Sequence, residues 1–263
     1  MQTVKEFVAE RKRLLSELVK GKGKPPRFAV IQVGDVPSSN AYVRGKLKDA
    51  DEIGIIPVHI HLPEEITQEA LLSEVERCNK DPEICGLIVQ LPLPKHISEE
   101  AVKLAIDPKK DIDGFHPLSS FDPCTPKGII MYLESIGFSF SGKNAVVLGR
   151  SNIVGKPMAK MLLARSCNVT VLHSKTTEED KAFYIAHADL IVVAIGRQGF
   201  LDERFAYLPS AIVVDVGINR GEDGHLHGDA VPSLPVSLQT PVPGGVGLLT
   251  RLALMQNILE ADR

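Results

Sequence analysis

A tyrosine and a lysine stand four residues apart in the string NAYVRGKLKDADEIGI, residues 40–55. If this stretch is helical, Tyr42 and Lys46 lie one turn apart on the same face. A lysine amine can act as a general base, but only in its neutral form, which partial burial favours. Taken alone, the string is more typical of a solvated surface helix whose lysine charges balance those of neighbouring acidic residues. The role of Lys46 therefore depends on what the rest of the chain places around it.

Strings that predict strands alternate with strings that predict helices in the first part of the chain. RFAVIQVG is followed by the helix at 40–54, which Pro37 to Asn40 precede as breaker and capping residues, and then by IPVHIHL. Thr67 can cap QEALLSEVERCNK, ICGLIVQL follows as a third strand, and Ser98 can cap EEAVKLAI. This alternation favours parallel strands, whose ligands bind beyond the carboxyl ends. Tyr42, Lys46 and Gln90 fall near that edge.

A second α/β series begins after DPKKDIDGFHPLSSFDPCTPKG, a string dense in Pro, Gly, Asp and Ser that is typical of a linker. Four valine-rich runs follow, NAVVLG, NVTVLH, ADLIVVAIG and AIVVDVGIN, and Pro157 suits the first turn of the helix after the first run. The series is typical of a dinucleotide-binding sheet. A glycine-rich turn, TPVPGGVG, then leads to LLTRLALMQNILEA, which predicts an amphipathic closing helix that packs back on the first domain.

The turn GRSNIVGKP after the first of these runs is only a weak match to a dinucleotide fingerprint. Ser151 stands where the second glycine is expected, and the spacing to the last glycine is one residue longer. The next strand ends in HSKTT, without the acid that usually binds the ribose 2′-hydroxyl of NAD. Ser174 can donate to a 2′-phosphate and Arg150 can add a charged fork. The sequence therefore favours NADP over NAD.

Composition excludes several classes of protein. The chain has 263 residues, 44% of them hydrophobic, and a net charge of -3 with no basic runs, which argues against a nucleic-acid partner. Its apolar runs are far shorter than the roughly 20 residues of a membrane span. The N-terminal string mixes acids and bases, unlike a targeting peptide, so we expect a cytoplasmic protein.

The four cysteines form no zinc-like spacing, which predicts buried reduced thiols, and no acids or cysteines cluster with the histidine pairs His59/His61 and His225/His227. No metal site is predicted.

Eight strings in order, YVRGK, VQLPLP, KDIDGFHP, PCTPKG, VVLGRSNIVGKPMA, VTVLHSKT, DVGIN and TPVPGGVG, resemble the bifunctional methylenetetrahydrofolate dehydrogenase/methenyltetrahydrofolate cyclohydrolase family. The resemblance is collinear from about residue 27 onward. It implies two α/β domains with a cleft between them, the second Rossmann-like. The substrate domain would cover residues 1–120, closed by 243–263, and the NADP domain 121–242.

The resemblance also implies an activity and a homodimer. The enzyme would oxidise 5,10-methylenetetrahydrofolate to the 5,10-methenyl form with NADP and then hydrolyse that product to 10-formyltetrahydrofolate, within one-carbon metabolism and purine biosynthesis. Lys46 and Tyr42 match the active-site lysine and tyrosine, Gln90 the glutamine that holds the lysine, and Asp113 the aspartate that anchors the pterin. The positions implied to bind substrate are Tyr42, Val43, Arg44, Gly45, Lys46, Val89, Gln90, Leu91, Asp113, Pro243, Gly244, Gly245, Val246 and Gly247, and those implied to bind NADP are Gly149, Arg150, Ser151, Ser174 and Ile218.

Three features depart from the family pattern. The segment 114–123 is shorter than the family's, Leu248 and Leu249 replace a Pro-Met pair, and the N-terminus is shorter. These departures bear on substrate affinity and dimer packing more than on the chemistry. Two other functions stay open at this point: an NADP oxidoreductase for a small acid on the same two-domain plan, and a non-catalytic folate-binding protein.

Overall fold

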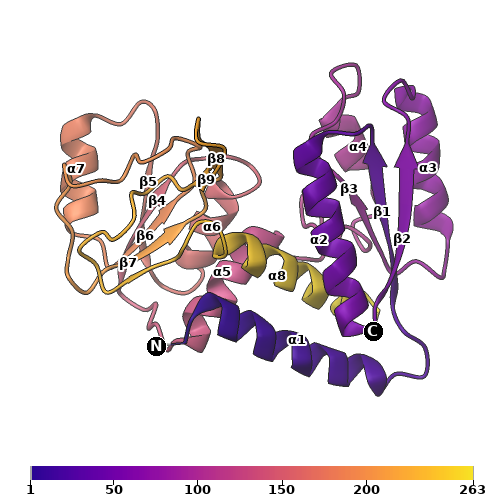
Figure 1. The fold of residues 1–263 in the computed structure, drawn as a ribbon, viewed down its shortest axis with the longest axis horizontal. Helices are drawn as coiled ribbons and strands as arrows, with labels where there is room; N and C mark the ends of the chain where they lie inside the picture. The colour runs from indigo at the N-terminus through magenta and orange to yellow at the C-terminus, as the bar shows by residue number, and fades with distance from the viewer. Residues whose placement is uncertain (1, 263) are drawn as a thin grey trace. The chain divides into compact units, whose positions relative to one another are not determined.

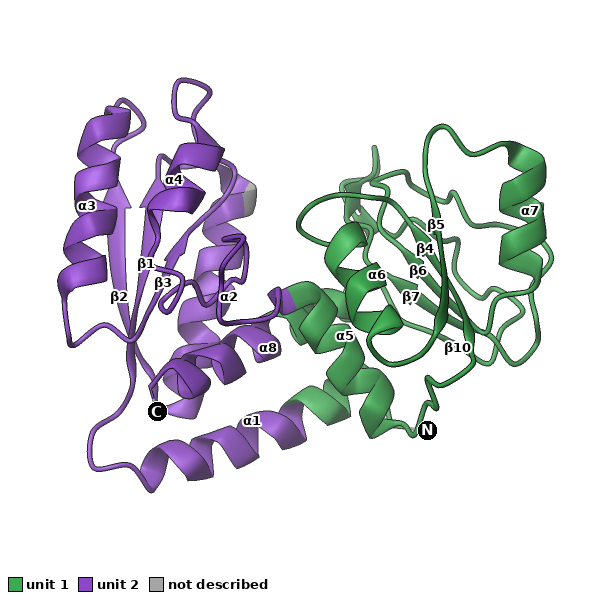
Figure 2. Cartoon of the chain, turned by 180° about the vertical axis from the view of Figure 1, so that it is seen from behind, with its two compact units in different colours: residues 1–8, 125–250 green, residues 9–124, 251–263 purple. Residues whose placement is uncertain are grey.

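The computed structural model describes residues 2–262 and divides the chain into two compact units (Figure 2). The three-stranded unit consists of Ala9–Cys124 and the chain from Arg251 onward, and the five-stranded unit consists of the chain up to Val8 and Thr125–Thr250. Both units are α/β, so the predicted fold class is confirmed. The predicted cleft between domains stays a prediction.

The three-stranded unit is built on a parallel sheet in the order β2-β1-β3 (Figure 1). Its strands are β1 (Arg27–Val33), β2 (Ile56–Leu62) and β3 (Gly86–Val89). The central strand β1 is almost wholly buried, as expected for a parallel strand covered on both faces. Pro57 lies within β2, where the missing N–H is tolerated because β2 is an edge strand. The parallel pairing predicted from the alternation is confirmed.

Helix α2 (Pro37–Ile53) connects β1 to β2, helix α3 (Gln68–Lys80) connects β2 to β3, and helix α4 (Glu99–Ala105) follows β3. The predicted caps of the last two are present: the hydroxyl of Thr67 accepts from the Ala70 N–H at 3.2 Å, and that of Ser98 accepts from the Ala101 N–H at 3.2 Å. A hydroxyl cap satisfies one of the N–H groups that a helix start leaves unpaired.

Helix α2 begins three residues earlier than predicted. Pro37 is its first residue rather than a breaker before it, and the capping residue Val36 makes no side-chain cap bond. Proline suits this place because its fixed φ is helical and its missing N–H would have been unpaired there. The predicted capping by the residues at 37–40 is therefore wrong, and Tyr42 and Lys46 lie well inside the helix rather than in its first turn.

The five-stranded unit has a parallel sheet in the order β10-β7-β6-β4-β5. Its strands are β4 (Asn144–Leu148), β5 (Asn168–Leu172), β6 (Leu190–Val193), β7 (Ile212–Asp215) and β10 (Leu238–Gln239), and β8 (Asn219–Arg220) pairs with β9 (Leu226–His227) in a separate antiparallel ribbon. The chain passes from β4 to β5 on one side and then returns to β6 on the other side of β4. This reversal is a topological switch point, and ligands of such sheets bind beyond the carboxyl ends of the two strands that flank it.

Apolar side chains cover both faces of this sheet. Val147 packs in one buried cluster with Met158, and its neighbour Val146 packs in another with Ile185, as the alternation of a strand requires. The covering helices are α5 (Cys124–Ser135), α6 (Gly155–Leu163) and α7 (Glu178–Ala186). Pro157 lies in the first turn of α6, as predicted. The last five residues of the predicted linker, 124–128, instead form the start of α5.

Helices α1 (Val4–Lys20) and α8 (Val246–Ala261) each contribute residues to both units. The prediction that α8 is amphipathic is wrong, because Leu252 to Met255 are buried in succession. A helix that is apolar all round is one that is surrounded by protein. Its C-terminal half packs back on the first domain, as predicted: Asp262, just beyond α8, pairs with Lys22 at 2.6 Å. None of the described helices is long and apolar enough to cross a membrane.

Candidate active site

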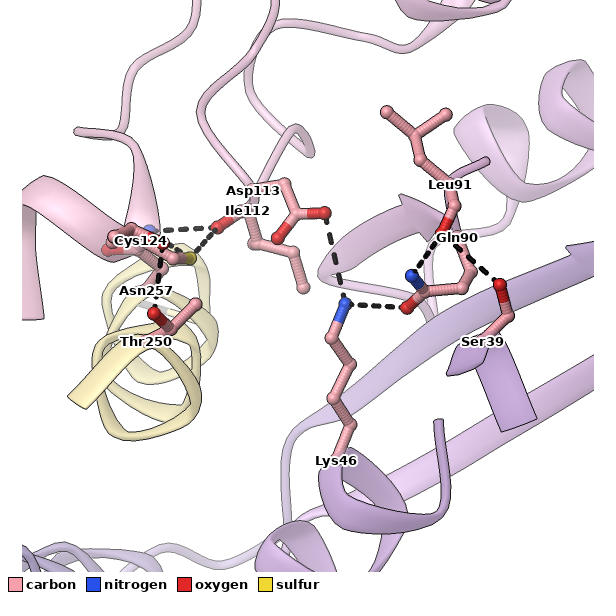
Figure 3. A network of polar contacts seen from close by, with 10 residues as sticks. Ser39, Lys46, Gln90, Leu91, Ile112, Asp113, Cys124, Thr250 and Asn257 are labelled. Carbon is pink, nitrogen blue, oxygen red and sulfur yellow. Dashed lines mark hydrogen bonds and ion pairs between the residues drawn. The ribbon is translucent and has the colours of Figure 1, made fainter. Parts of the chain in front are cut away.

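The amine of Lys46 lies at the carboxyl edge of the three-stranded sheet (Figure 3). Helix α2 follows β1 and presents Lys46 toward Gln90, the residue directly after β3. Lys46 Nζ donates to Gln90 Oε1 at 3.1 Å, while Gln90 Nε2 donates to the Leu91 carbonyl at 2.7 Å. The amide is therefore fixed with its oxygen toward the amine. The Lys46 side chain is only 8% exposed, which excludes the alternative of a solvated surface lysine.

Asp113 approaches the same amine from the other side. Its Oδ2 lies 4.0 Å from Lys46 Nζ, and the side chain is 16% exposed. The sequence did not predict this approach. Lys46 lies in a helix and Asp113 in irregular chain, so no helical or strand periodicity relates their positions. A carboxylate at this distance favours a charged amine, whereas the neutral amide of Gln90 does not. Gln90 and Asp113 thus give the amine one neutral and one anionic neighbour.

Tyr42 lies one turn before Lys46 on α2 and is 36% exposed. Burial raises the pKa of Tyr42, and the nearby Arg251 charge offsets this only in part. The phenol therefore keeps its proton at neutral pH and can donate a hydrogen bond. Its exposed ring also leaves an aromatic surface on which a planar ligand can stack.

The other predicted substrate residues of this unit differ in exposure. Val43 and Val89 are buried in the core, and Gly45 is buried against the Arg251 side chain. Arg44 is exposed on α2, and Leu91 is half-buried after β3. Val43 and Val89 thus contribute packing beneath the site, whereas Arg44 and Leu91 are accessible to a ligand.

A buried amide on α8 holds the loop that carries Asp113. The side chain of Asn257 is fully buried, and its Nδ2 donates to the Ile112 carbonyl at 2.8 Å and to the Asp122 carbonyl at 3.2 Å. The Cys124 thiol donates to the same Ile112 carbonyl at 3.3 Å. The two ends of the shortened segment 114–123 are thereby tied together next to Asp113. Nothing in the sequence pattern indicated this role for Asn257.

A second buried carboxylate shapes the same loop from within. Asp111 is 1% exposed, and its Oδ2 accepts from the His116 N–H at 2.8 Å. Burial raises the pKa of Asp111; the His116 hydrogen bond opposes this, and the charge of Asp113 adds to it. Two carboxylates two residues apart are thus kept in different environments, the first as a structural acceptor and the second near the amine.

The predicted NADP residues all follow strand ends on one edge of the five-stranded sheet. Gly149 follows β4 with a φ of 114°, and a Cβ there would lie 2.4 Å from the Ala194 carbonyl oxygen. Only glycine fits at this point of the switch. Arg150, Ser174 and Ile218 are exposed after β4, β5 and β7. They form a set of accessible groups along the carboxyl edge, where sheets of this topology generally bind dinucleotides.

Ser151 closes the turn before α6, a role that the sequence did not predict. Its hydroxyl accepts from the Val154 N–H at 3.1 Å and from the Gly155 N–H at 3.3 Å. It therefore closes the turn at the start of α6 in place of the glycine of the usual fingerprint.

The predicted substrate loop 243–247 is only partly a loop. Val246 and Gly247 are the first residues of α8, whereas Pro243 and Gly244 remain in the turn before it, with Gly245 buried against the Pro241 carbonyl. The histidine pair on β2 stacks with ring centroids 5.7 Å apart, because residues two apart on a strand share one face. Among residues 2–262, no three His, Cys, Asp or Glu side chains are grouped as metal ligands.

The fold and the site define a class of protein. A parallel sheet with a glycine turn at its switch point is typical of an NAD(P)-dependent enzyme, and a buried lysine held by an amide beside a carboxylate is a candidate acid–base site. The comparisons with known proteins give the family within this class.

Two family models match the chain. The model of the tetrahydrofolate dehydrogenase/cyclohydrolase catalytic domain matches residues 1–113, and that of its NAD(P)-binding domain matches residues 123–263. The chain belongs to the tetrahydrofolate dehydrogenase/cyclohydrolase family. This membership confirms the resemblance drawn from the eight strings.

Individual relatives agree with this assignment. The chain is 47% identical to the bifunctional protein FolD of Enterococcus faecalis over 253 residues, which cover 92% of this chain and 89% of the relative. The crystal structure of the bifunctional enzyme FolD from Campylobacter jejuni matches with a TM-score of 0.93 at 41% identity, covering 97% and 95% of the two chains. The Trypanosoma brucei FolD structure, a complex with NADP cofactor and an inhibitor, matches with a TM-score of 0.92 at 33% identity, covering 99% and 96%.

The chain is therefore an enzyme, an NADP-dependent dehydrogenase and cyclohydrolase of tetrahydrofolate one-carbon derivatives. Both alternatives that the sequence left open, a small-acid oxidoreductase and a non-catalytic folate-binding protein, are set aside by this membership. NADP fits the edge described above, since its exposed Arg150 and Ser174 supply a cation and a hydroxyl for a phosphate.

Proposed function

We propose that Lys46 is the general base of the hydrolytic step. Gln90 holds its amine, and Asp113 and Tyr42 bind the folate next to it. The observation that carries this proposal is the buried Lys46 amine, 3.1 Å from the Gln90 amide oxygen and 4.0 Å from the Asp113 carboxylate. The folate chemistry then belongs to a substrate domain of residues 1–120 with the closing segment 243–263, which includes most of the three-stranded unit. The NADP domain is 121–242.

The first reaction is a hydride transfer and needs no protein base. The one-carbon bridge of 5,10-methylenetetrahydrofolate gives a hydride to the nicotinamide of NADP, and the positive charge that remains is shared by two nitrogens. The protein contributes by holding the two reacting carbons close together, which lowers the entropic part of the barrier. Tyr42 stacks on the folate ring, and Asp113 accepts hydrogen bonds from its aminopyrimidine edge.

The second reaction is a hydrolysis and does need a base. Water adds to the methenyl carbon of the cation and loses a proton, and the ring then opens to 10-formyltetrahydrofolate. A neutral Lys46 takes the proton, and its burial together with the adjacent cationic carbon favours the neutral amine. Gln90 holds the amine without adding negative charge.

Binding of folate also changes the electrostatics of Asp113. In the free chain its carboxylate lies beside the amine and favours the ammonium form. When the carboxylate accepts hydrogen bonds from the pterin, these donors partly offset its charge, so it favours the ammonium form of Lys46 less strongly. Substrate binding thus favours the form of Lys46 that the second reaction requires.

The proposed cofactor residues all follow strands at the carboxyl edge of the five-stranded sheet. Gly149 and Ser151 would form the turn that the pyrophosphate approaches, Arg150 and Ser174 would bind the 2′-phosphate, and Ile218 would line the same NADP site. Pro243 and Gly244 border the folate. We further infer a cytoplasmic homodimer that serves purine biosynthesis.

The test replaces Lys46 by methionine, which keeps the length of the apolar stem and removes the amine. Loss of a general base costs roughly 10²–10⁴-fold in rate, so the hydrolysis of methenyltetrahydrofolate should fall by that factor. NADP reduction with methylenetetrahydrofolate should remain measurable. Both rates are read from the nicotinamide and methenyl absorbances.

Lys48→Met is the matched control, because Lys48 lies two residues further along the same helix with a side chain that is 76% exposed. It should leave both rates unchanged. Wild-type hydrolysis by Lys46→Met would refute the assignment of the base. Equal loss of both activities would show instead that Lys46 positions the folate.

A further inference from the structure

Asp229 is a fully buried carboxylate in the five-stranded unit that neither the sequence nor the proposed site uses. Its Oδ2 accepts from the N–H groups of Ile195 at 2.7 Å and Gly196 at 2.9 Å. Its Oδ1 accepts from the Arg197 N–H at 2.8 Å and from Asn219 Nδ2 at 2.9 Å. Both oxygens are thus engaged, each with two donors.

These donors belong to two segments that border the predicted cofactor edge. Residues 195–197 follow β6, one of the two strands that flank the switch point, and the preceding carbonyl of Ala194 is the atom that a Cβ at Gly149 would meet. Asn219 directly follows Ile218 and begins β8. A movement of Asp229 would therefore reach both the glycine turn and the segment of Ile218.

Successive backbone N–H groups that converge on one point form an anion-binding nest. In this chain the anion is the chain's own carboxylate, so the loop after β6 is fixed before any ligand binds. A loop that is already ordered loses less conformational entropy when the dinucleotide binds beside it. An amide in place of the carboxylate would direct an NH₂ group at donors and leave at least one of them unpaired.

Asp229 is itself held by the end of β7. The Asp215 carboxylate accepts from the Asp229 N–H at 3.0 Å and from the Ala230 N–H at 2.9 Å. The Asp215 N–H in turn donates to the Thr240 hydroxyl at 2.8 Å. The support of the loop after β6 thus extends from the neighbouring strand of the same sheet, and it does not depend on exposed side chains.

We propose that Asp229 is a positioning residue for NADP, which sets the loop after β6 and the segment of Ile218 at the carboxyl edge of the five-stranded sheet. This inference rests on the proposed cofactor site. Asp229 touches neither substrate nor cofactor, and its effect should appear in NADP affinity rather than in the folate chemistry.

The test compares Asp229→Asn with the wild-type enzyme in three measurements: NADP dissociation constant by calorimetry, KM for NADP in the dehydrogenase reaction, and hydrolysis of methenyltetrahydrofolate without NADP. The first two should rise at least about tenfold, which corresponds to about 1.4 kcal/mol. The NADP-free hydrolysis should stay within about twofold of the wild-type rate. A general loss of folded protein would instead lower the rates of hydrolysis and of the dehydrogenase reaction together.

Asp189→Asn is the matched control. Asp189 precedes β6 at the opposite edge of the sheet, where its carboxylate accepts from the Asn144 N–H at 2.9 Å and pairs with Lys143 at 2.9 Å. This variant also loses bonds at one end of β6 but should keep wild-type NADP affinity. Wild-type affinity in Asp229→Asn, or equal loss in both variants, would overturn the inference.

Asn219→Ala decides the question if Asp229→Asn does not fold. It removes one of the four donors, and NADP affinity should fall about threefold with hydrolysis unchanged; no change in affinity would overturn the inference. Failure of the proposed cofactor site would look different. In that case Arg150→Ala would bind NADP like the wild type, whatever the Asp229 variant does.

Discussion

Replacing Asn257 by alanine should loosen the loop that carries Asp113 and weaken folate binding. The amide is fully buried, and it ties Ile112 to Asp122 across the base of the shortened segment. Asp113 directly follows Ile112, so a shift of that carbonyl changes the direction of the carboxylate. The substitution thus acts on the residue next to the proposed anchor, Asp113, but removes none of the side chains proposed to contact the substrate.

The magnitude follows from the two hydrogen bonds. Each contributes about 0.5–1.5 kcal/mol net, and a buried carbonyl left without a partner costs about 1–3 kcal/mol. The Ile112 carbonyl keeps the Cys124 thiol as a donor, and Asp122 is exposed and can be hydrated, so the upper part of that range does not apply. The two bonds together predict a loss of about 1–3 kcal/mol in the free energy of unfolding, or roughly 2–12 °C in Tm.

The assay combines thermal unfolding with steady-state kinetics. KM for methylenetetrahydrofolate should rise in Asn257→Ala while KM for NADP stays constant. Gln256→Ala is the control on the same helix, because the half-buried Gln256 side chain bonds to Glu260 at 3.2 Å and to Arg11 at 3.4 Å and not to the loop that carries Asp113. A surface change of this kind is usually within about 0.5 kcal/mol. Asn257→Ala with wild-type stability, or with equal changes in both KM values, would refute the reasoning.

Two further predictions concern α2 and the histidine pair. Gly45→Ala should lower Tm, although alanine normally stabilises a helix interior by about 1 kcal/mol. Its Cβ would lie 2.0 Å from Arg251 Nη1 and would displace this guanidinium from its 2.9 Å ion pair with the buried Asp49; a higher Tm would contradict this. Burial, and then the charge of His61, lower the pKa of His59, so the unfolded chain binds more protons as pH falls below the ordinary histidine value. Stability due to His59 is therefore present above that value and lost below it, and His59→Gln should show a smaller fall in Tm between pH 7 and pH 5 than the wild type; identical slopes would contradict the assignment.

The sequence predicts the fold best where hydrophobic periodicity and the parallel direction of the strands determine it. Lys46 and Gln90 could be placed on one edge because parallel strands bring successive carboxyl ends together. The caps Thr67 and Ser98 were likewise found from local chemistry alone. The start of α2 was missed because proline is read equally well as a breaker or as a first helical residue.

Contacts that depend on the path of irregular chain were not predicted, even for Asp113, which the resemblance had implied as a site residue. The approach of Asp113 to Lys46 and the two bonds of Asn257 join segments that are far apart in sequence and have no common period. The sequence of α8 predicts an amphipathic helix because polar side chains in a helix are usually exposed. Asn257 shows why this fails: a polar side chain inside a helix is fully buried when backbone carbonyls of a loop need a donor.

The same principle connects the two units of the enzyme. In each, a buried side chain bonds to the backbone of a loop beyond the strand ends: Asn257 donates to carbonyls next to Asp113, and Asp229 accepts from N–H groups next to the glycine turn. Neither side chain needs a ligand to complete its bonds, so both loops are ordered before substrate or cofactor binds. Polar groups buried in this way therefore serve the chemistry indirectly, because the energy of binding is not spent on ordering the loops.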